Sequence, residues 1–173
     1  LDLVEQNRRG TTVEQARIVI RFKSAKYTIE RPLLLGAALA GAPDALASVL
    51  SDFGLALGEA FQLRDDLLGV FGDTAATGKP AGDDLRERKQ TVLLALAQAH
   101  PVHGQALMRL LAGEGDVDIN EARRLIDASG ARDDVELRIS ELLQSALASI
   151  KVLPDGPRQA LSDLAVLATT RTA

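Results

Sequence analysis

The chain has 173 residues, of which 46% are hydrophobic and 25% charged, and its formal net charge is −4. This mixture is typical of a single globular domain, and the negative charge argues against a nucleic-acid-binding surface held by bulk charge. The absence of cysteine excludes disulfides, zinc ribbons, iron–sulfur clusters and thiol nucleophiles. Ala and Leu supply about a third of the chain and aromatic residues only 3%, so we expect an all-α fold.

The sequence also limits where the protein resides. No stretch offers the ~20 consecutive, mainly apolar residues that a membrane-spanning helix needs. The first residues, Leu1 to Gln6, are acidic and contain no basic n-region, so we expect no signal peptide and a cytoplasmic location. Because the chain does not begin with Met, we expect it to derive from a larger protein.

The first expected helix follows a capping signal. Thr11 stands three residues before Glu14, which is the spacing of a capping box. Behind it, apolar residues recur at helical spacing at positions 13, 16, 20 and 27. Lys23 falls on the same stripe, where a charged side chain needs a partner.

The rest of the chain is predicted to be helical, with one long loop. Three glycines and a proline predict a loop over residues 72–82. Gly54 and Gly58, four residues apart, would let a neighbouring helix approach closely. Asp118 is expected to cap a helix that ends near Gly130. The other helices are expected at about 32–41, 44–71, 83–99, 102–112, 133–152 and 157–170.

The strongest candidate for a functional site lies on the helix expected over residues 44–71. Gln62, Asp65, Asp66 and Gly69 are spaced so that they share one helix face. Two adjacent carboxylates in an apolar helix repel each other unless a cation neutralises them. Oxygen ligands without Cys or clustered His indicate Mg²⁺. The alternative is that Arg64 or Arg31 pairs with the carboxylates on a solvated face.

Lysines add to this interpretation. Lys79 lies in the glycine-rich loop and Lys89 follows soon after Asp84. Carboxylates, Mg²⁺ and lysines together form a phosphate site, because the metal bridges carboxylate to phosphate and ammonium groups hold the other oxygens. Taken singly, each lysine is more simply a surface residue.

Two motifs resemble the trans-isoprenyl diphosphate synthases. The run from Phe61 to Thr91, with Phe-Gln-x-x-Asp-Asp-Leu-Leu, Thr-Gly-Lys-Pro-x-Gly-x-Asp and Arg-Glu-x-Lys-x-Thr, resembles their second aspartate-rich region. Lys23-Ser24-Ala25-Lys26-Tyr27 resembles their upstream Lys-Thr-Ala-x-Tyr segment. The resemblance is good over about residues 1–95, and the remainder matches as a helical tail.

The resemblance implies a fold, a reaction and roles for residues. The fold would be the C-terminal portion of an isoprenoid-synthase-type helical bundle, over residues 1–173, usually in a homodimer. Such enzymes use Mg²⁺ to ionise an allylic diphosphate, which then condenses with isopentenyl diphosphate. By the resemblance, Asp65 and Asp66 would bind the metal and Asp84 would steady the lysine loop or a metal-bound water. Lys23, Lys79 and Lys89 would hold the diphosphate, and Ser24 and Gln62 would hydrogen-bond near the reacting ends.

Three positions depart from the family pattern. Gly69 stands where the family usually has a third Asp, so we expect weakened metal binding. Ser24 replaces Thr and keeps the hydroxyl. Arg88 replaces a small residue, and it would either add a cation near the diphosphate or face solvent.

No first aspartate-rich motif is present. Asp133 and Asp134 are more simply partners of a helix dipole. We therefore expect the chain to be inactive alone and to need the missing N-terminal half or a partner synthase. Two alternatives stay open. The first is a fragment like a class I terpene cyclase, because the spacing of Asp65, Asp66, Gly69 and Asp73 resembles the second motif of those enzymes. The second is a non-catalytic helical subunit that dimerises with an active synthase.

Overall fold

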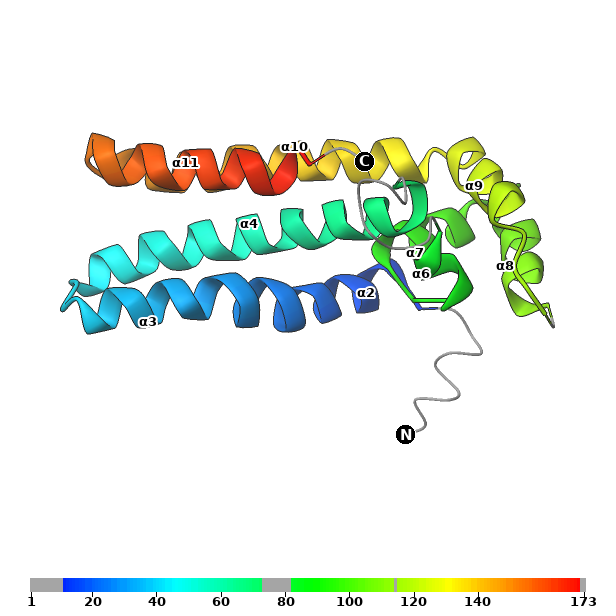
Figure 1. The fold of residues 1–173 in the computed structure, drawn as a ribbon, viewed down its shortest axis with the longest axis horizontal. Helices are drawn as coiled ribbons and strands as arrows, with labels where there is room; N and C mark the ends of the chain where they lie inside the picture. Colours follow the sequence, from blue (N-terminus) through cyan, green and yellow to red (C-terminus); the bar gives the residue numbers. More distant parts are fainter. Residues whose placement is uncertain (1–10, 73–81, 114, 172–173) are drawn as a thin grey trace. The chain divides into compact units, whose positions relative to one another are not determined.

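The computed structural model describes residues 11–72, 82–113 and 115–171. Regular structure within these ranges is helical, without a strand (Figure 1), which confirms the predicted all-α class. None of the described helices is long and apolar enough to cross a membrane. The chain divides into two compact units: unit 1 comprises residues 1–17, 65–136 and 172–173, and unit 2 comprises residues 18–64 and 137–171.

Unit 2 is built on a few long helical segments. Helix α2 (Val13–Ile20), whose last residues belong to this unit, continues into η1 (Arg21–Glu30) and α3 (Arg31–Leu39). Helix α4 (Asp44–Phe71) matches the prediction, and its first three-quarters lie in unit 2. The unit is completed by most of α10 (Ala131–Ser149), by the short 3₁₀ segment η2 (Ile150–Val152) and by α11 (Asp155–Thr169).

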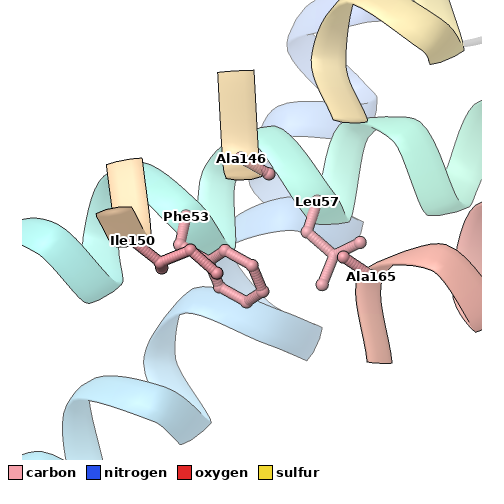
Figure 2. Packing of buried hydrophobic residues seen from close by; sticks show 5 residues of the cluster. All are labelled: Phe53, Leu57, Ala146, Ile150 and Ala165. Atoms are coloured by element: carbon pink, nitrogen blue, oxygen red, sulfur yellow. The ribbon is translucent and has the colours of Figure 1, made fainter. Parts of the chain in front are cut away.

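The core of unit 2 joins residues that are far apart in the sequence. Figure 2 shows Phe53 and Leu57 of α4 against Ala146 of α10, Ile150 of η2 and Ala165 of α11. All of them are almost fully buried, and burying a large apolar side chain is worth about 1.5–3 kcal/mol. This core fixes the first part of α4 against the C-terminal helices.

Two glycines bring η1 close to α4, as the sequence predicted. A Cβ atom built on Gly54 would lie 2.8 Å from Glu30 Cα, and one built on Gly58 would overlap Ala25 Cα. Real side chains do not tolerate such contacts, so only glycine allows the two backbones to approach this closely.

The segment η1 is a π-helix, which the sequence analysis did not predict. The Arg31 N–H, for example, donates to the carbonyl of Lys26, five residues earlier. The wider turn carries the buried stripe from Ile20 to Ser24 and Ala25, and Lys23 is exposed. Tyr27, which was expected on the buried stripe, is 74% exposed. Both expectations were wrong because they assumed the α-helical period throughout.

Unit 1 contains shorter helices. These are α6 (Asp83–Arg86), α7 (Val92–Ala99), α8 (Gly104–Ala112) and α9 (Ile119–Ala128), and they pack on one another around fully buried leucines and Ile126. A single helix over 83–99 was predicted, and the break at residues 87–91 corrects it. The predicted loop 72–82 lies outside the described residues, apart from its two end glycines.

Two helix caps test the sequence signals. Asp118 accepts a hydrogen bond from Glu121 N–H (3.1 Å) at the start of α9, as predicted. At the start of α2 the capping box is one residue later than predicted. Gln15 N–H donates to Thr12 Oγ1 (3.2 Å), and Thr12 N–H donates to Gln15 Oε1 (3.0 Å). The amide of Gln15 therefore takes the role that was assigned to Glu14.

Candidate functional site

The two adjacent carboxylates of α4 lie in different environments. Asp66 is 2% exposed, whereas Asp65 is exposed to solvent. Successive side chains on an α-helix point about 100° apart, so a helix that buries Asp66 turns Asp65 outward. The pair thus consists of one buried and one accessible carboxylate.

Lys89 joins Asp66 to Asp84 in unit 1. Its Nζ lies 3.3 Å from Asp66 Oδ1 and 3.0 Å from Asp84 Oδ2. Burial by itself would lower the pKa of Lys89, but the Asp66 and Asp84 carboxylates outweigh it and raise the pKa above the ordinary 10.5. Lys89 is therefore a firmly charged ammonium group, and we call Asp66, Asp84 and Lys89 the lysine–carboxylate cluster.

A local turn places Lys89 beside Asp84. After α6, Arg88 takes a left-handed conformation with φ of 52°. Arg88 N–H donates to the carbonyl of Leu85 (3.1 Å), and Lys89 N–H donates to the carbonyl of Asp84 (2.9 Å). These two bonds form a Schellman motif, which reverses the chain at the helix end.

Gly69 leaves room for the cluster. A Cβ atom at this position would lie 2.5 Å from Asp84 Cγ and would overlap one of its carboxylate oxygens. The space beside α4 that a side chain at position 69 would enter is thus filled by the carboxylate of Asp84. The carboxylate beside this turn of α4 therefore belongs to Asp84 of α6.

Ser24 and Gln62 meet in unit 2. The hydroxyl of Ser24 donates to Gln62 Oε1 over 2.6 Å, which turns the amide nitrogen of Gln62 away from Ser24. The π-helical turn directs Ser24 toward α4, and Gly58 lets η1 come within reach. The two residues that were predicted to hydrogen-bond near the reacting ends, Ser24 and Gln62, are thus hydrogen-bonded to each other.

The other two predicted diphosphate ligands are Lys23 and Lys79. Lys23 lies on η1 in unit 2 and is exposed. Lys79 lies outside the described residues. The structure thus brings together Asp66, Asp84 and Lys89 in one unit, and Ser24 and Gln62 in the other.

Mg²⁺ is the metal that the sequence predicted for these carboxylates. In the ranges that the structure describes, no group of three or more His, Asp or Glu side chains converges so that it could hold a metal. The donor chemistry of Asp65, Asp66 and Asp84 nevertheless fits, since Mg²⁺ prefers carboxylate oxygens and is usually bound by one or two of them together with substrate phosphates.

Sequence reasoning missed two cations at the C-terminal end of α4. The Nε of Arg123 donates to the carbonyl of Val70 (2.7 Å). The guanidinium of Arg132 lies over the ring of Phe71, 4.4 Å from its centroid. The last carbonyls of a helix lack partners within the helix and attract positive charge. The end of the carboxylate helix was therefore a signal that could have located them.

Two arginines link α4 to the C-terminal end of α11 and the residues that follow it. Arg64 was considered as a partner for the carboxylates, and its Nε donates to the carbonyl of Thr169 at the end of α11 (2.7 Å). The guanidinium of Arg171 lies 4.7 Å from the ring centroid of Phe61. Both contacts lie within unit 2 and hold the end of α11 to the turn of α4 that precedes the carboxylates.

Comparison with known proteins agrees with these motifs. Residues 1–128 match the family model for polyprenyl synthetases. Octaprenyl diphosphate synthase of Escherichia coli (strain K12) is 36% identical over 175 residues, which cover 99% of this chain and 54% of that protein. Geranylgeranyl diphosphate synthase of Mycobacterium tuberculosis is 38% identical over 128 residues, which cover 72% of this chain and 36% of that protein.

A solved structure extends the similarity to the fold. The geranylgeranyl pyrophosphate synthase of Corynebacterium glutamicum, complexed with isoprenyl diphosphate and magnesium, matches with a TM-score of 0.89 and 46% identity. The match covers 98% of this chain and 50% of that one. The chain thus spans about half the length of these relatives. It belongs to the polyprenyl synthetase family.

Proposed function

We propose that this chain is the portion of a prenyl diphosphate synthase that binds the diphosphate of an allylic substrate together with Mg²⁺. Completed by the remainder of such an enzyme, it would take part in condensing that substrate with isopentenyl diphosphate. The observation that supports this most is the lysine–carboxylate cluster, because Asp66, Asp84 and Lys89 occupy positions of the family motif and meet in space.

The proposed reaction separates charge. The bond between the allylic carbon and the diphosphate oxygen breaks, and the electron pair leaves with the diphosphate. The double bond of isopentenyl diphosphate attacks the allylic carbon, a carbon–carbon bond forms, and loss of a proton gives a chain five carbons longer. Bound Mg²⁺ would supply charge neutralisation for the leaving diphosphate.

The residues of this chain would bind and orient the diphosphate. Two of the three ammonium hydrogens of Lys89 face Asp66 and Asp84, so a phosphate oxygen would accept the third. Lys23 and Lys79 would hold further oxygens. Asp65, which is accessible, and Asp66 would carry the metal, and fixed charges of this kind stabilise the leaving group where its charge develops.

Ser24 and Gln62 would act as neutral hydrogen-bonding groups. Because the Ser24 hydroxyl is bonded to Gln62 Oε1, the amide nitrogen of Gln62 is the end that would donate to a substrate atom. A neutral donor suits a position near the reacting carbons, since a fixed negative charge there would bind the allylic cation itself.

The comparisons favour this proposal over a terpene cyclase fragment, since the relatives named above are prenyl diphosphate synthases. The non-catalytic subunit is the competing outcome of the experiment below. A homodimer stays a prediction from the resemblance, and a cytoplasmic location stays a prediction from the N-terminal sequence.

The test is calorimetric titration of the 173-residue chain with a non-hydrolysable allylic diphosphate analogue, with and without Mg²⁺. We expect Mg²⁺-dependent binding that Asp65→Asn and Asp66→Asn each weaken by about tenfold or more, and no turnover by the chain alone. Asp116→Asn, at an exposed carboxylate before α9, is the matched control. Binding that is absent, or that ignores both substitutions in folded protein, would contradict the proposal and favour the non-catalytic subunit.

A further inference from the structure

Arg88 holds an unusual backbone conformation. In the ranges that the structure describes, it is the one residue other than glycine with a positive φ, 52°. A residue with a Cβ atom is strained in this left-handed region, because the Cβ atom crowds the following carbonyl oxygen. Such strain persists where surrounding contacts determine the conformation. The contacts of Arg88 must therefore hold the turn.

The guanidinium of Arg88 makes the first of these contacts. The sequence left two roles open for this side chain: a cation near the diphosphate, or a group that faces solvent. The side chain is exposed, but its Nη2 donates to the carbonyls of Gly113 (2.7 Å) and Gly115 (3.4 Å). Gly113 is the C-cap of α8, and the carbonyls at a helix end attract positive charge because they lack partners within the helix. Arg88 thus ties the turn to the end of α8.

The backbone carbonyl of Arg88 is held as well. Gln90 Nε2 donates to this carbonyl (3.2 Å), and Gln90 Oε1 accepts a hydrogen bond from the Thr11 N–H (3.4 Å). The amide of Gln90 therefore links the turn to the residues that precede α2. All of these residues belong to unit 1, so the turn is fixed on two sides within one compact unit.

Lys89 takes its direction from this turn. Its Nζ lies 3.3 Å from Asp66 Oδ1 and 3.0 Å from Asp84 Oδ2. A change of the backbone dihedral angles at Arg88 would swing the whole Lys89 side chain, because these angles set the direction of the residue that follows. The conformation of Arg88 therefore decides whether Lys89 reaches both carboxylates.

The ion pairs of Lys89 are a weaker restraint on the turn than the guanidinium is. The Lys89 side chain is 38% exposed, so solvent screens its ion pairs. Its flexible four-carbon stem also tolerates movement of the backbone, whereas the planar guanidinium donates in fixed directions. The contact from Arg88 to Gly113 spans 25 residues of sequence, so it joins two separate segments of unit 1.

We propose that Arg88 is a positioning residue for Lys89. Its guanidinium clamps the left-handed turn to the end of α8, and the clamped turn holds the Lys89 ammonium between Asp66 and Asp84. Arg88 itself would not contact the diphosphate, because its guanidinium is engaged by the carbonyls beyond α8. The consequence for substrate rests on the proposed function, in which Lys89 donates its third ammonium hydrogen to a phosphate oxygen.

The test compares Arg88→Ala with Arg88→Gly in the full 173-residue chain. Both substitutions remove the guanidinium and its charge, but alanine keeps the strain of the turn and glycine relieves it. In calorimetric titration with Mg²⁺ and the non-hydrolysable allylic diphosphate analogue, Arg88→Ala should weaken binding about threefold to fivefold and Arg88→Gly less than about twofold.

Two controls show whether Arg88 acts through Lys89. In a Lys89→Gln background, Arg88→Ala should cause no further loss of binding, because effects that pass through one residue are not additive. Arg109→Ala removes an exposed cation from the last turn of α8 and should leave binding unchanged. Equal weakening by Arg88→Ala and Arg88→Gly would instead assign Arg88 to direct contact with the diphosphate. No weakening by Arg88→Ala, or a loss that persists without Lys89, would also overturn the inference.

A second measurement does not need the substrate. The Lys89 N–H donates to the carbonyl of Asp84 (2.9 Å) within the turn. Its hydrogen exchange, followed by NMR, should be several-fold faster in Arg88→Ala and unchanged in Arg88→Gly. If the unsubstituted chain fails to bind the analogue, the proposed function fails. The exchange rates then decide on the clamp alone, and equal rates in Arg88→Ala and the unsubstituted chain would refute it.

Discussion

The lysine–carboxylate cluster of unit 1 and the Ser24–Gln62 pair of unit 2 are built by different physical means. The cluster gathers three charged groups, two of them carboxylates, and Lys89 forms an ion pair with each carboxylate. The pair is neutral and depends on a close approach of two helix backbones at Gly58. Charge compensation governs the first and packing the second, so different substitutions should damage each.

Gly58→Leu should give the largest effect. A Cβ atom at this position would overlap the backbone of Ala25, which cannot move aside as a flexible side chain can. We expect a loss of roughly 3 kcal/mol or more in the free energy of unfolding, measured by urea denaturation.

Gly36→Ala is the matched control for that packing prediction. It lies within α3, and a Cβ atom there meets nothing within 4 Å. Alanine is the better helix former, so we expect a gain of about 0.5–1 kcal/mol. Equal stabilities of the Gly58→Leu and Gly36→Ala variants would show that close approach does not hold η1 to α4.

Asp66→Ala should have the next largest effect, this time on the cluster. The substitution removes a buried carboxylate and leaves Lys89 with Asp84 alone. Because the Lys89 side chain is 38% exposed, solvent screens part of the loss, and we expect about 1–3 kcal/mol.

The neighbouring Asp65→Ala should change the unfolding free energy by less than about 0.5 kcal/mol, because Asp65 is exposed. Both variants should still weaken Mg²⁺-dependent binding of the diphosphate analogue. Similar destabilisation by the two substitutions, measured side by side by urea denaturation, would remove the distinction between the buried and the accessible carboxylate.

Arg88 allows the turn that builds the cluster to be tested separately. Arg88→Ala and Arg88→Gly both remove the hydrogen bond from Nη2 to the Gly113 carbonyl (2.7 Å), but only glycine adopts φ of 52° without strain. The glycine variant should therefore be more stable than the alanine variant by about 1 kcal/mol in thermal unfolding. The reverse order would mean that the left-handed turn carries no strain.

The smallest effect should be the alkaline pH dependence of stability. The pKa of Lys89 is raised by Asp66 and Asp84 above the ordinary 10.5, so the folded protein holds this proton more firmly than the unfolded chain does. The resulting stabilisation is complete below pH 10.5 and is lost as pH rises through the folded pKa. Lys89→Gln should flatten the alkaline fall of the urea midpoint, and Lys151→Gln should leave it unchanged. Parallel curves for Lys89→Gln and the unsubstituted chain would be evidence against the ion pairs.

Much of this protein could be predicted from local sequence signals. The abundance of Ala and Leu determined the all-α class, and Pro43 and Gly72 bracket a helix that the structure places at Asp44–Phe71. Asp118 capped its helix as expected, and the spacing of Gly54 and Gly58 indicated close helix packing. Each of these signals acts within a few residues, so neighbouring residues suffice to read it. The two motifs indicated the family for a similar reason, because both are contiguous.

The tertiary structure decided which of the motif residues face inward and which meet. The α-helical period placed Lys23 on the buried stripe, but the π-helical turn buries Ser24 and exposes Lys23. Spacing could not tell Asp65 from Asp66, since tertiary packing decides which side of α4 is buried. The single helix predicted over 83–99 hid the turn at Arg88 that returns Lys89 to Asp84. Contacts between residues distant in the chain decided these points, and composition and periodicity carry no information about them.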